Sequence, residues 1–389
     1  MKNNYSFTYN DIFVAYNDCI KNKSKTYNAI DFSIDKTKNL IELCDEINNN
    51  EYKIGKSIAF IVKYPVYREV FAANFRDRIV HHLVINELLP YFEKEFIDES
   101  FSCRKNKGVL FGIKTMNEKI KECTENYTKD AWVLKMDIKS FFMSINKQIL
   151  SENIDKFIVD KYPNNRKKEK LRWLCKLIIM HHPELNCEKR CDLSLWKKLP
   201  LGKSLFDVGE SCGLPIGNLT SQIFANFYLN PLDKFIKYVL DFEYYGRYVD
   251  DFLIISTDKE KLLKSIKPIE NFSKEKLKIV IHKNKRYLQH YSKGVKFIGG
   301  FLKPNRIYII NRTKGNLFYK IKNKFSNYSE KLKNDFMMCV NSYLGYMSKF
   351  STYKIRKKIL NNSVLFNTWK KHIIIDTKFY KKILLKTDN

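Results

Sequence analysis

The chain has 389 residues, 44% of them hydrophobic and 14% aromatic, which is enough for a large hydrophobic core. Its 71 Lys and Arg against 42 Asp and Glu give a formal net charge of +29, which indicates a polyanionic partner and favours nucleic acid over a membrane surface. There is no run of 18 apolar residues and no apolar signal core, and the nine cysteines are scattered, so we expect a cytoplasmic protein with reduced thiols and no membrane contact.

The N-terminal third of the chain offers basic candidates. Residues 1–60 are predicted to form helices with one polar face and no catalytic feature. Residues 61–125 begin with two strand-like runs on either side of Pro65, which predict a bent hairpin. Lys63 and Arg68 would project from this hairpin and neutralise phosphate charge; the alternative for both is ordinary solvated surface.

The rest of this region is predicted to be a helix followed by a basic loop. The helix covers 78–92 and contains His81 and His82, which point in different directions on a helix and are therefore not expected to share a metal ion. The loop contains Arg104 and Lys107 and ends in a glycine.

Two acidic sites follow in the middle of the chain. A short apolar strand is predicted to end at Asp137, and Phe141 and Phe142 come shortly after it. Asp250 lies 113 residues after Asp137 and is followed by Asp251, in what is predicted to be a tight hairpin. An Asp-Asp pair is often only a solvated turn. A carboxylate on a neighbouring strand would complete a site for two metal ions, and Mg²⁺ prefers carboxylates together with phosphate oxygens.

The segment between the acidic sites holds a predicted insertion and a glycine motif. Residues 161–212 are predicted to form a helix at 167–180 and then a polar loop. Cys187 and Cys191 have a spacing seen between zinc ligands, but no second close pair follows, so an insertion without zinc is favoured over a zinc site. The stretch 213–217 reads Gly-Leu-Pro-Ile-Gly, whose glycines let the backbone approach a base pair.

The C-terminal part is the most basic. A helix and then a strand at 278–282 are predicted, followed by Lys283 and Lys285, one of which is expected beside the acidic site. Residues 301–389 contain 20 Lys and Arg against 4 Asp and Glu, a net +16, with aromatic residues at helical spacing. Such a segment is expected to bind a nucleic-acid duplex through its phosphates, although part of it could dock a protein or a structured RNA instead.

Three of these motifs, in this order, resemble the reverse transcriptase family: Asp137 with its two phenylalanines, the stretch 213–217, and Tyr-Val-Asp-Asp at 248–251. The resemblance covers about 62–302. It implies an α+β fold, a right-hand polymerase with fingers, an antiparallel-sheet palm and a helical thumb. The expected domains are an N-terminal helical extension at 1–60, fingers at 61–125, a palm at 126–305 that carries the insertion near 161–212, and a basic helical thumb at 306–389.

The resemblance also implies roles for single residues. Catalytic roles fall to Asp137, Asp250, Asp251 and Lys285, the lysine as a proton donor to the leaving pyrophosphate, with phosphate binding as the alternative. Two Mg²⁺ ions, or Mn²⁺ in their place, would be held at Asp137, Ile138, Asp250 and Asp251. Nucleotide-binding residues would be Lys63, Arg68, Phe142, Ile216 and Gly217. Nucleic-acid-binding residues would be Arg104, Lys107, Gln222, Tyr248, Gly299 and Gly300. Phe142, packed under the incoming sugar, would exclude a 2′-hydroxyl, which favours DNA synthesis and disfavours an RNA-dependent RNA polymerase.

Ile216 is a departure from the family, in which many members have glutamine at this position. Glutamine can hydrogen-bond the nucleotide, whereas isoleucine makes apolar contact alone, so selection should be looser. The form of 216–222 resembles reverse transcriptases of diversity-generating retroelements, which copy a template RNA with frequent errors at adenines. Related forms occur in bacterial antiphage defence, where the product would be DNA made from a non-coding RNA or without a template.

The expected partners are therefore a template or non-coding RNA, nascent cDNA and dNTPs. A small basic accessory protein and self-association are further partners that the resemblance allows. A non-catalytic RNA-binding scaffold that keeps the polymerase fold is the third hypothesis, and retention of the three aspartates and Phe142 argues against it.

Overall fold

The computed structural model describes residues 6–21, 23–63, 66–362 and 366–386. They form two compact units. The first unit comprises Met1–Cys103, Met136–Asp241 and Lys264–Lys285, and the second comprises Arg104–Lys135, Phe242–Leu263 and Arg286–Asn389. The boundary falls inside strand β3 (Trp132–Asp137), between Lys135 and Met136. In the described part of the chain, none of the helices is both long and apolar enough to cross a membrane.

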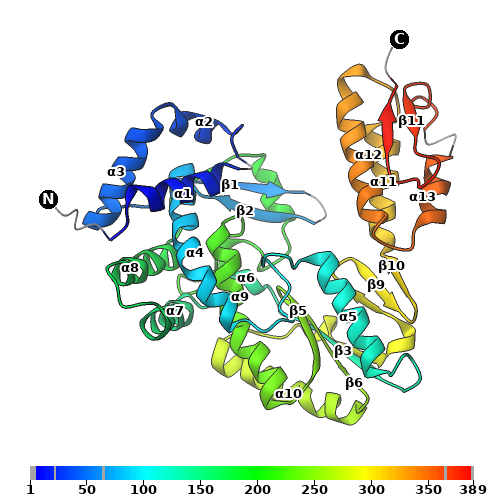
Figure 1. Cartoon of the computed structure of the whole chain (residues 1–389), viewed down its shortest axis with the longest axis horizontal. Helices are drawn as coiled ribbons and strands as arrows, with labels where there is room; N and C mark the ends of the chain where they lie inside the picture. Colours follow the sequence, from blue (N-terminus) through cyan, green and yellow to red (C-terminus); the bar gives the residue numbers. More distant parts are fainter. Residues whose placement is uncertain (1–5, 22, 64–65, 363–365, 387–389) are drawn as a thin grey trace. The chain divides into compact units, whose positions relative to one another are not determined.

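Helices that pack side by side form the body of the first unit (Figure 1). They are α1 (Tyr9–Ile20), α2 (Tyr27–Ile34), α3 (Lys36–Asn49), α4 (Phe75–Glu95), α6 (Phe141–Ser144), α7 (Lys147–Lys161), α8 (Lys167–Met180) and α9 (Leu219–Lys234). Helix α4 packs against both α1 and α9, and α7 packs against α8. The side chain of Thr8 caps α1 and Asp11 caps the Thr8 backbone in return, which explains where this helix begins. A π-helical turn, Phe235–Val239, follows α9.

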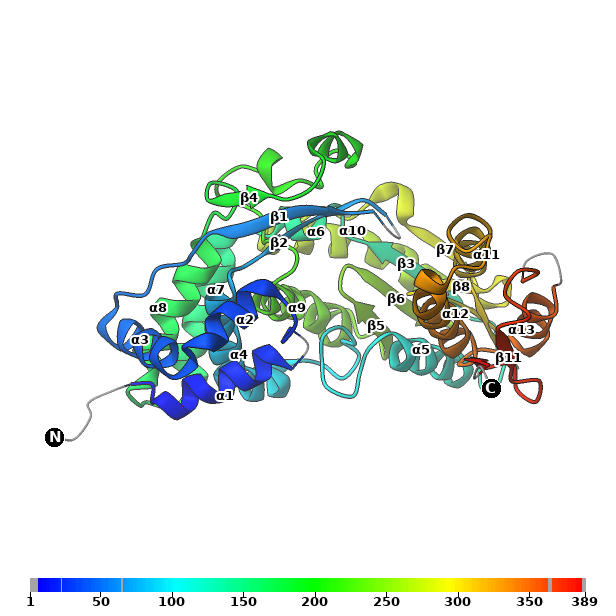
Figure 2. The ribbon, with the colours of Figure 1, turned by 90° about the horizontal axis from the view of Figure 1, so that it is seen from above.

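A small sheet in the first unit carries the predicted hairpin. Strands β1 (Ser57–Val62) and β2 (Arg68–Ala72) are antiparallel, and β4 (Cys187–Lys189) lies parallel to β1, as Figure 2 shows. The two antiparallel strands agree with the prediction, whereas Pro65 lies outside the described residues. The two faces of β2 differ because side chains alternate along a strand: Glu69 and Phe71 are buried, and Arg68 is exposed.

The second unit is built on a sheet with the order β5-β6-β3-β7. Its strands other than β3 are β5 (Tyr244–Tyr248), β6 (Asp251–Ser256) and β7 (Tyr287–His290), and helix α5 (Val109–Cys123) packs on β5 and β6. Adjacent strands β5 and β6 are antiparallel, and so are β3 and β7. Helix α10 (Lys259–Leu277) follows β6 and crosses the unit boundary. The expected α+β class with antiparallel sheets is thereby confirmed.

The C-terminal segment of the second unit is mostly helical, but it also contains strands. A sheet with the order β10-β9-β8 precedes the helices, and an antiparallel strand pair follows them. The elements are β8 (Val295–Phe297), β9 (Gly300–Lys303), β10 (Arg306–Ile309), α11 (Asn311–Lys324), α12 (Lys333–Met347), α13 (Tyr353–Leu360), β11 (Ile373–Ile375) and β12 (Ile383–Leu385). Trp369 is buried and stacks on Phe336 at a ring-centroid distance of 3.8 Å. The strands β11 and β12 lie within 306–389, the range predicted to be a helical thumb, and they were not predicted from the sequence.

Candidate active site

Asp137 is the last residue of β3, and residues that follow α10 in the first unit form hydrogen bonds with it. Lys285 Nζ lies 2.9 and 3.0 Å from the two carboxylate oxygens of Asp137. The backbone carbonyl of Asp137 accepts a hydrogen bond from the His282 N–H at 2.7 Å, and Ile138 forms a bridge with Ile281. The predicted strand at 278–282 is therefore reduced to this isolated bridge. The structure thus brings Lys285, and not Lys283, into contact with Asp137 through a described ion pair.

The second pair of aspartates lies on the hairpin between β5 and β6 in the second unit. Tyr248 pairs with Asp251, so Val249 and Asp250 form the turn. Val249 has a φ of 56°, in the left-handed region. The buried side chain of Arg247 donates to the Val249 carbonyl at 3.0 Å. The chain direction at Asp250 is thereby held by a cation beneath the turn.

Lys135 was not predicted from the sequence to be a site residue. In the structure it forms an ion pair with Asp251 of the hairpin. Its Nζ lies 2.7 Å from Asp251 Oδ2 and donates to the Lys296 carbonyl at 2.9 Å. Both charged side chains are mostly covered, with 14% of Lys135 and 18% of Asp251 exposed. The signal in the sequence was a single lysine in an otherwise apolar strand, two residues before Asp137. The first unit contains Asp137, and the second contains Asp250 and Asp251.

The residues expected to select the nucleotide meet at β2. Phe142 and Ile216 are half-buried and pack against a cluster that contains Phe71. The Phe71 N–H donates to the Ile216 carbonyl at 2.8 Å, and the Leu214 N–H donates to the Phe142 carbonyl at 2.8 Å. Gly217 has a φ of 126°, and an added Cβ would lie 2.8 Å from a Val70 methyl and 2.9 Å from the Phe71 carbonyl oxygen. A glycine is therefore required at this close approach.

The remaining candidates are placed as follows. Lys63 and Arg68 are exposed at one end of the β1–β2 pair. Arg104 is buried and Lys107 is half-exposed, with its Nζ 6.0 Å from the Phe111 ring centroid. Gly299 and Gly300 lie before and in β9, where an added Cβ would meet Tyr346 Oη at 3.0 Å and Ile113 at 3.1 Å respectively.

The two cysteines considered as zinc ligands have other contacts. The Cys191 Sγ accepts a hydrogen bond from the Ile61 N–H at 3.4 Å, and burial raises the pKa of the Cys187 thiol, which disfavours the thiolate that zinc needs. Across the described ranges there is no group of three or more His, Cys, Asp or Glu side chains that could hold a metal ion.

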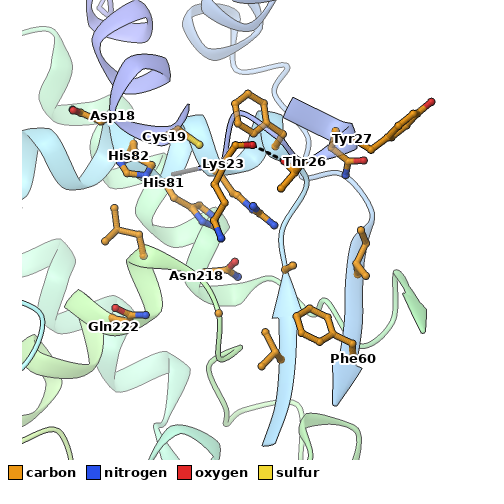
Figure 3. Close-up of a pocket in the computed structure, with 18 of the residues that line it drawn as sticks. Asp18, Cys19, Lys23, Thr26, Tyr27, Phe60, His81, His82, Asn218 and Gln222 are labelled. Atoms are coloured by element: carbon orange, nitrogen blue, oxygen red, sulfur yellow. Dashed lines mark hydrogen bonds between the residues drawn. The ribbon is translucent and has the colours of Figure 1, made fainter. Parts of the chain in front are cut away.

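A cavity of about 830 Å³ in the first unit was not predicted from the sequence. Figure 3 shows Lys23 beyond the end of α1, Phe60 on β1 and Gln222 on α9 around it. Its cationic wall also includes Arg78 and Arg190, and burial lowers the pKa of Arg78. Cations and aromatic rings around one cavity suit a nucleotide, whose phosphate and base they can bind together.

Comparison with known proteins identifies the family. Residues 65–301 match the family described as "Reverse transcriptase (RNA-dependent DNA polymerase)", which is more than half of the chain. The chain belongs to the reverse transcriptase family. Reverse transcriptases use divalent metal ions, and membership is consistent with the right-hand polymerase fold expected from the sequence.

Individual proteins that resemble this chain have low sequence identity to it. Protein YkfC of Escherichia coli is 23% identical over 260 residues, which cover 58% of this reverse transcriptase and 60% of YkfC. Telomerase of Candida albicans in complex with a fragment of telomeric RNA has a TM-score of 0.45 and 11% identity, over 81% of this chain and 59% of that one. Apo telomerase of Candida tropicalis has a TM-score of 0.49 and 14% identity, over 82% and 57% respectively. The chain thus spans about 60% of the length of these proteins.

Proposed function

We propose that this reverse transcriptase copies an RNA template into DNA by two-metal nucleotidyl transfer at Asp137, Asp250 and Asp251. The observation that carries the proposal is the ion pair between Lys135 and Asp251. Alternate residues of a strand point to the same face, so the strand that presents Lys135 to Asp251 presents Asp137 in the same direction two residues later. This register supports one acidic site made from both motifs.

The donor set suits divalent cations. Hard carboxylate oxygens are the ligands that Mg²⁺ prefers, and Mn²⁺ can replace it. Asp137 and Asp251 each have a lysine as counter-charge, which a divalent cation would replace on binding. Bound ions would activate the primer 3′-hydroxyl and stabilise the leaving pyrophosphate. Ile138 would contribute to the metal site through its position beside Asp137.

The remaining residues of the site bind, orient and protonate. Lys63 and Arg68 hold the triphosphate, and Phe142 excludes a ribose 2′-hydroxyl. Lys285, already within hydrogen-bond distance of Asp137, gives a proton to the departing pyrophosphate. The template RNA enters the cavity beside Gln222, while Arg104, Lys107, Tyr248 and the glycine pair Gly299–Gly300 contact the primer–template duplex.

The finer proposal is a diversity-generating reverse transcriptase of low fidelity that acts in the cytoplasm. It rests on Ile216, an apolar residue that can offer a nascent base pair no side-chain hydrogen bond. The partners of such an enzyme would be a template RNA, nascent cDNA and dNTPs. A small basic accessory protein and self-association would be further interactions. The competing pathway is antiphage defence, with DNA made from a non-coding RNA or without a template.

The test is to purify the protein with the RNA that it carries from its native locus, supply dNTPs and Mg²⁺, and sequence the product. A cDNA with substitutions concentrated at template adenines would support diversity generation. A faithful, repetitive or untemplated product would support defence and overturn the finer proposal. Asp250→Asn is expected to abolish synthesis while folding and RNA binding remain nearly unchanged, because it replaces a metal ligand by a neutral isostere. Full activity of Asp250→Asn would overturn the assignment of the site, and a wild-type protein that binds RNA without synthesis would indicate the scaffold hypothesis.

A further inference from the structure

The segment 187–212 of the first unit is attached to the β1–β2 pair. Strand β4 pairs with β1 from Ser57 to Ala59, and the Arg190 N–H then donates to the Ala59 carbonyl at 2.8 Å. Lys189 places its Nζ 3.9 Å from the ring centroid of Phe206, further along the same segment. The segment is therefore a packed layer on one face of the strand pair, although its sequence resembles a polar loop.

A buried carboxylate holds this layer in place. Glu69 on β2 is 1% exposed and accepts hydrogen bonds from three groups of the segment. The Trp196 indole N–H donates at 2.7 Å, the Ser204 hydroxyl at 2.8 Å and the Leu205 backbone N–H at 2.6 Å. Hydrogen bonds to an ionised acceptor are about twice as strong as neutral ones, and a buried carboxylate needs such partners. Glu69 thus locks the segment onto the strand pair.

The locked segment packs directly behind the residues proposed to select the nucleotide. Leu205 belongs to the buried cluster with Ala59, Phe71 and Met143. Phe142 and Ile216 pack against this cluster, together with Trp196, Phe206 and Val208 of the segment, and the rings of Phe71 and Phe206 are 5.5 Å apart. Leu205 also fits tightly against Gly213, where an added Cβ would lie 2.5 Å from a Leu205 methyl. A displacement of Leu205 would therefore change the packing around both Phe142 and the loop 213–217.

We propose that segment 187–212 determines nucleotide selection by fixing the positions of Phe142 and Ile216, and that Glu69 is the positioning residue that locks the segment. The proposal rests on the proposed function, because it takes Phe142 and Ile216 as neighbours of the incoming nucleotide. A steric gate excludes a hydroxyl group only while its own side chain cannot yield, so loosening the packing behind Phe142 should admit ribonucleotides more readily.

The test compares Glu69→Gln with the wild type and with Glu210→Gln, which changes an exposed carboxylate of the same segment. A glutamine presents an NH₂ group where Glu69 has only acceptors, so at least one donor of the segment loses its partner. We expect the KM for dNTPs to rise about tenfold, kcat to change less than about threefold, and the preference for dNTPs over rNTPs to fall about tenfold. Trp196→Phe, which removes one donor, should move the same quantities less, and Glu210→Gln should leave them unchanged.

A readout independent of activity accompanies these rates. Trypsin should cleave folded Glu69→Gln faster than wild type at Lys197, Lys198 and Lys203, since these lysines lie in the segment that is released. An unchanged preference between dNTPs and rNTPs in folded Glu69→Gln and Trp196→Phe would overturn the proposal, and so would unchanged cleavage. Absence of DNA synthesis by the wild type would overturn the proposed function instead, and the cleavage rates would still decide whether Glu69 locks the segment.

Discussion

Val249 shows how the acidic hairpin is held at the level of one residue. A β-branched residue at a φ of 56° is strained, because its side chain crowds the backbone there. The compensation comes from Arg247, two residues earlier, which is fully buried and donates to the Val249 carbonyl. The strained turn and the buried cation fix the direction in which Asp250 and Asp251 leave the hairpin.

Lys135 offers the corresponding test on the neighbouring strand. Lys135→Met keeps the length of the side chain but removes the cation from Asp251 and the donor from the Lys296 carbonyl. We expect DNA synthesis to fall about 10- to 100-fold, because a mostly covered carboxylate without its cation has an uncompensated charge and no longer keeps its position. Primer extension at saturating RNA measures this. Lys129→Met is the matched control, since its ion pair with Glu125 is exposed and contributes little. Activity of Lys135→Met within about twofold of wild type would contradict the role of this lysine.

At the scale of elements, the sequence predicted those whose signal is local. The periodic apolar pattern predicted α8 at its observed bounds, and the strand before Asp137 and the hairpin at 248–251 follow from apolar runs that flank charged residues. The strands β4, β11 and β12 were missed because each has three residues, too few for a recognisable alternating pattern. In addition, β4 forms only where the distant strand β1 pairs with it. Strand prediction failed at 278–282 for the converse reason, because only a single bridge forms there.

The same distinction applies to the site. Motif residues such as Asp137 and Asp250 are recognisable by type and spacing. Lys135 and Glu69 are not, because their importance depends on which residue of a distant segment lies opposite, and a sequence without its fold does not reveal this register. The cavity beside Gln222 was missed for the same reason, since its walls come from helices and strands far apart in the chain.

Helix α4 carries a prediction about pH. The pKa of His81 is lowered to about 3, mainly by burial. The neighbouring side chains of His82 and Arg78 lower it further. Its unfolded value is 6.5, so the unfolded chain binds the proton more readily. The contribution of His81 to the free energy of unfolding is therefore fully present above pH 6.5. It is lost as the pH falls from 6.5 toward 3, by about 1.4 kcal/mol per pH unit.

The measurement is the urea midpoint of the wild type and of His81→Leu between pH 7 and pH 5. The leucine cannot bind a proton, so the variant should lose less stability over this interval. The Nδ1 atom of His81 has no hydrogen-bond partner, so the substitution breaks no bond at that atom. Equal pH dependence in both proteins would show that His81 is not the titrating group.

At the scale of the whole molecule, the net charge of +29 should govern affinity for RNA. Neutralised phosphates release counterions, so affinity falls steeply with salt, with a slope of about 0.7 to 0.9 per phosphate contact. Lys354, Lys357 and Lys358 are exposed on α13. Replacing all three by Ala should weaken binding to a primer–template duplex and reduce the salt slope by about two to three units.

Fluorescence anisotropy with a labelled duplex, over a series of salt concentrations, measures both quantities. Lys38→Ala in α3, at an exposed position outside the basic C-terminal segment, serves as the control and should leave the slope unchanged within about one unit. A triple variant with the wild-type slope would place the duplex elsewhere than on α13.

Strand β2 is a wall shared by two compartments of the first unit. Val70 and Ala72 line the cavity on one face, while Glu69 and Phe71 on the other face hold the layer behind Ile216. A ligand that shifts this strand from the cavity side therefore also shifts the hydrogen bond between the Phe71 N–H and the Ile216 carbonyl. Thermodynamic linkage then requires reciprocity: whatever factor an occupant of the cavity applies to nucleotide affinity, a bound nucleotide applies to the affinity of that occupant.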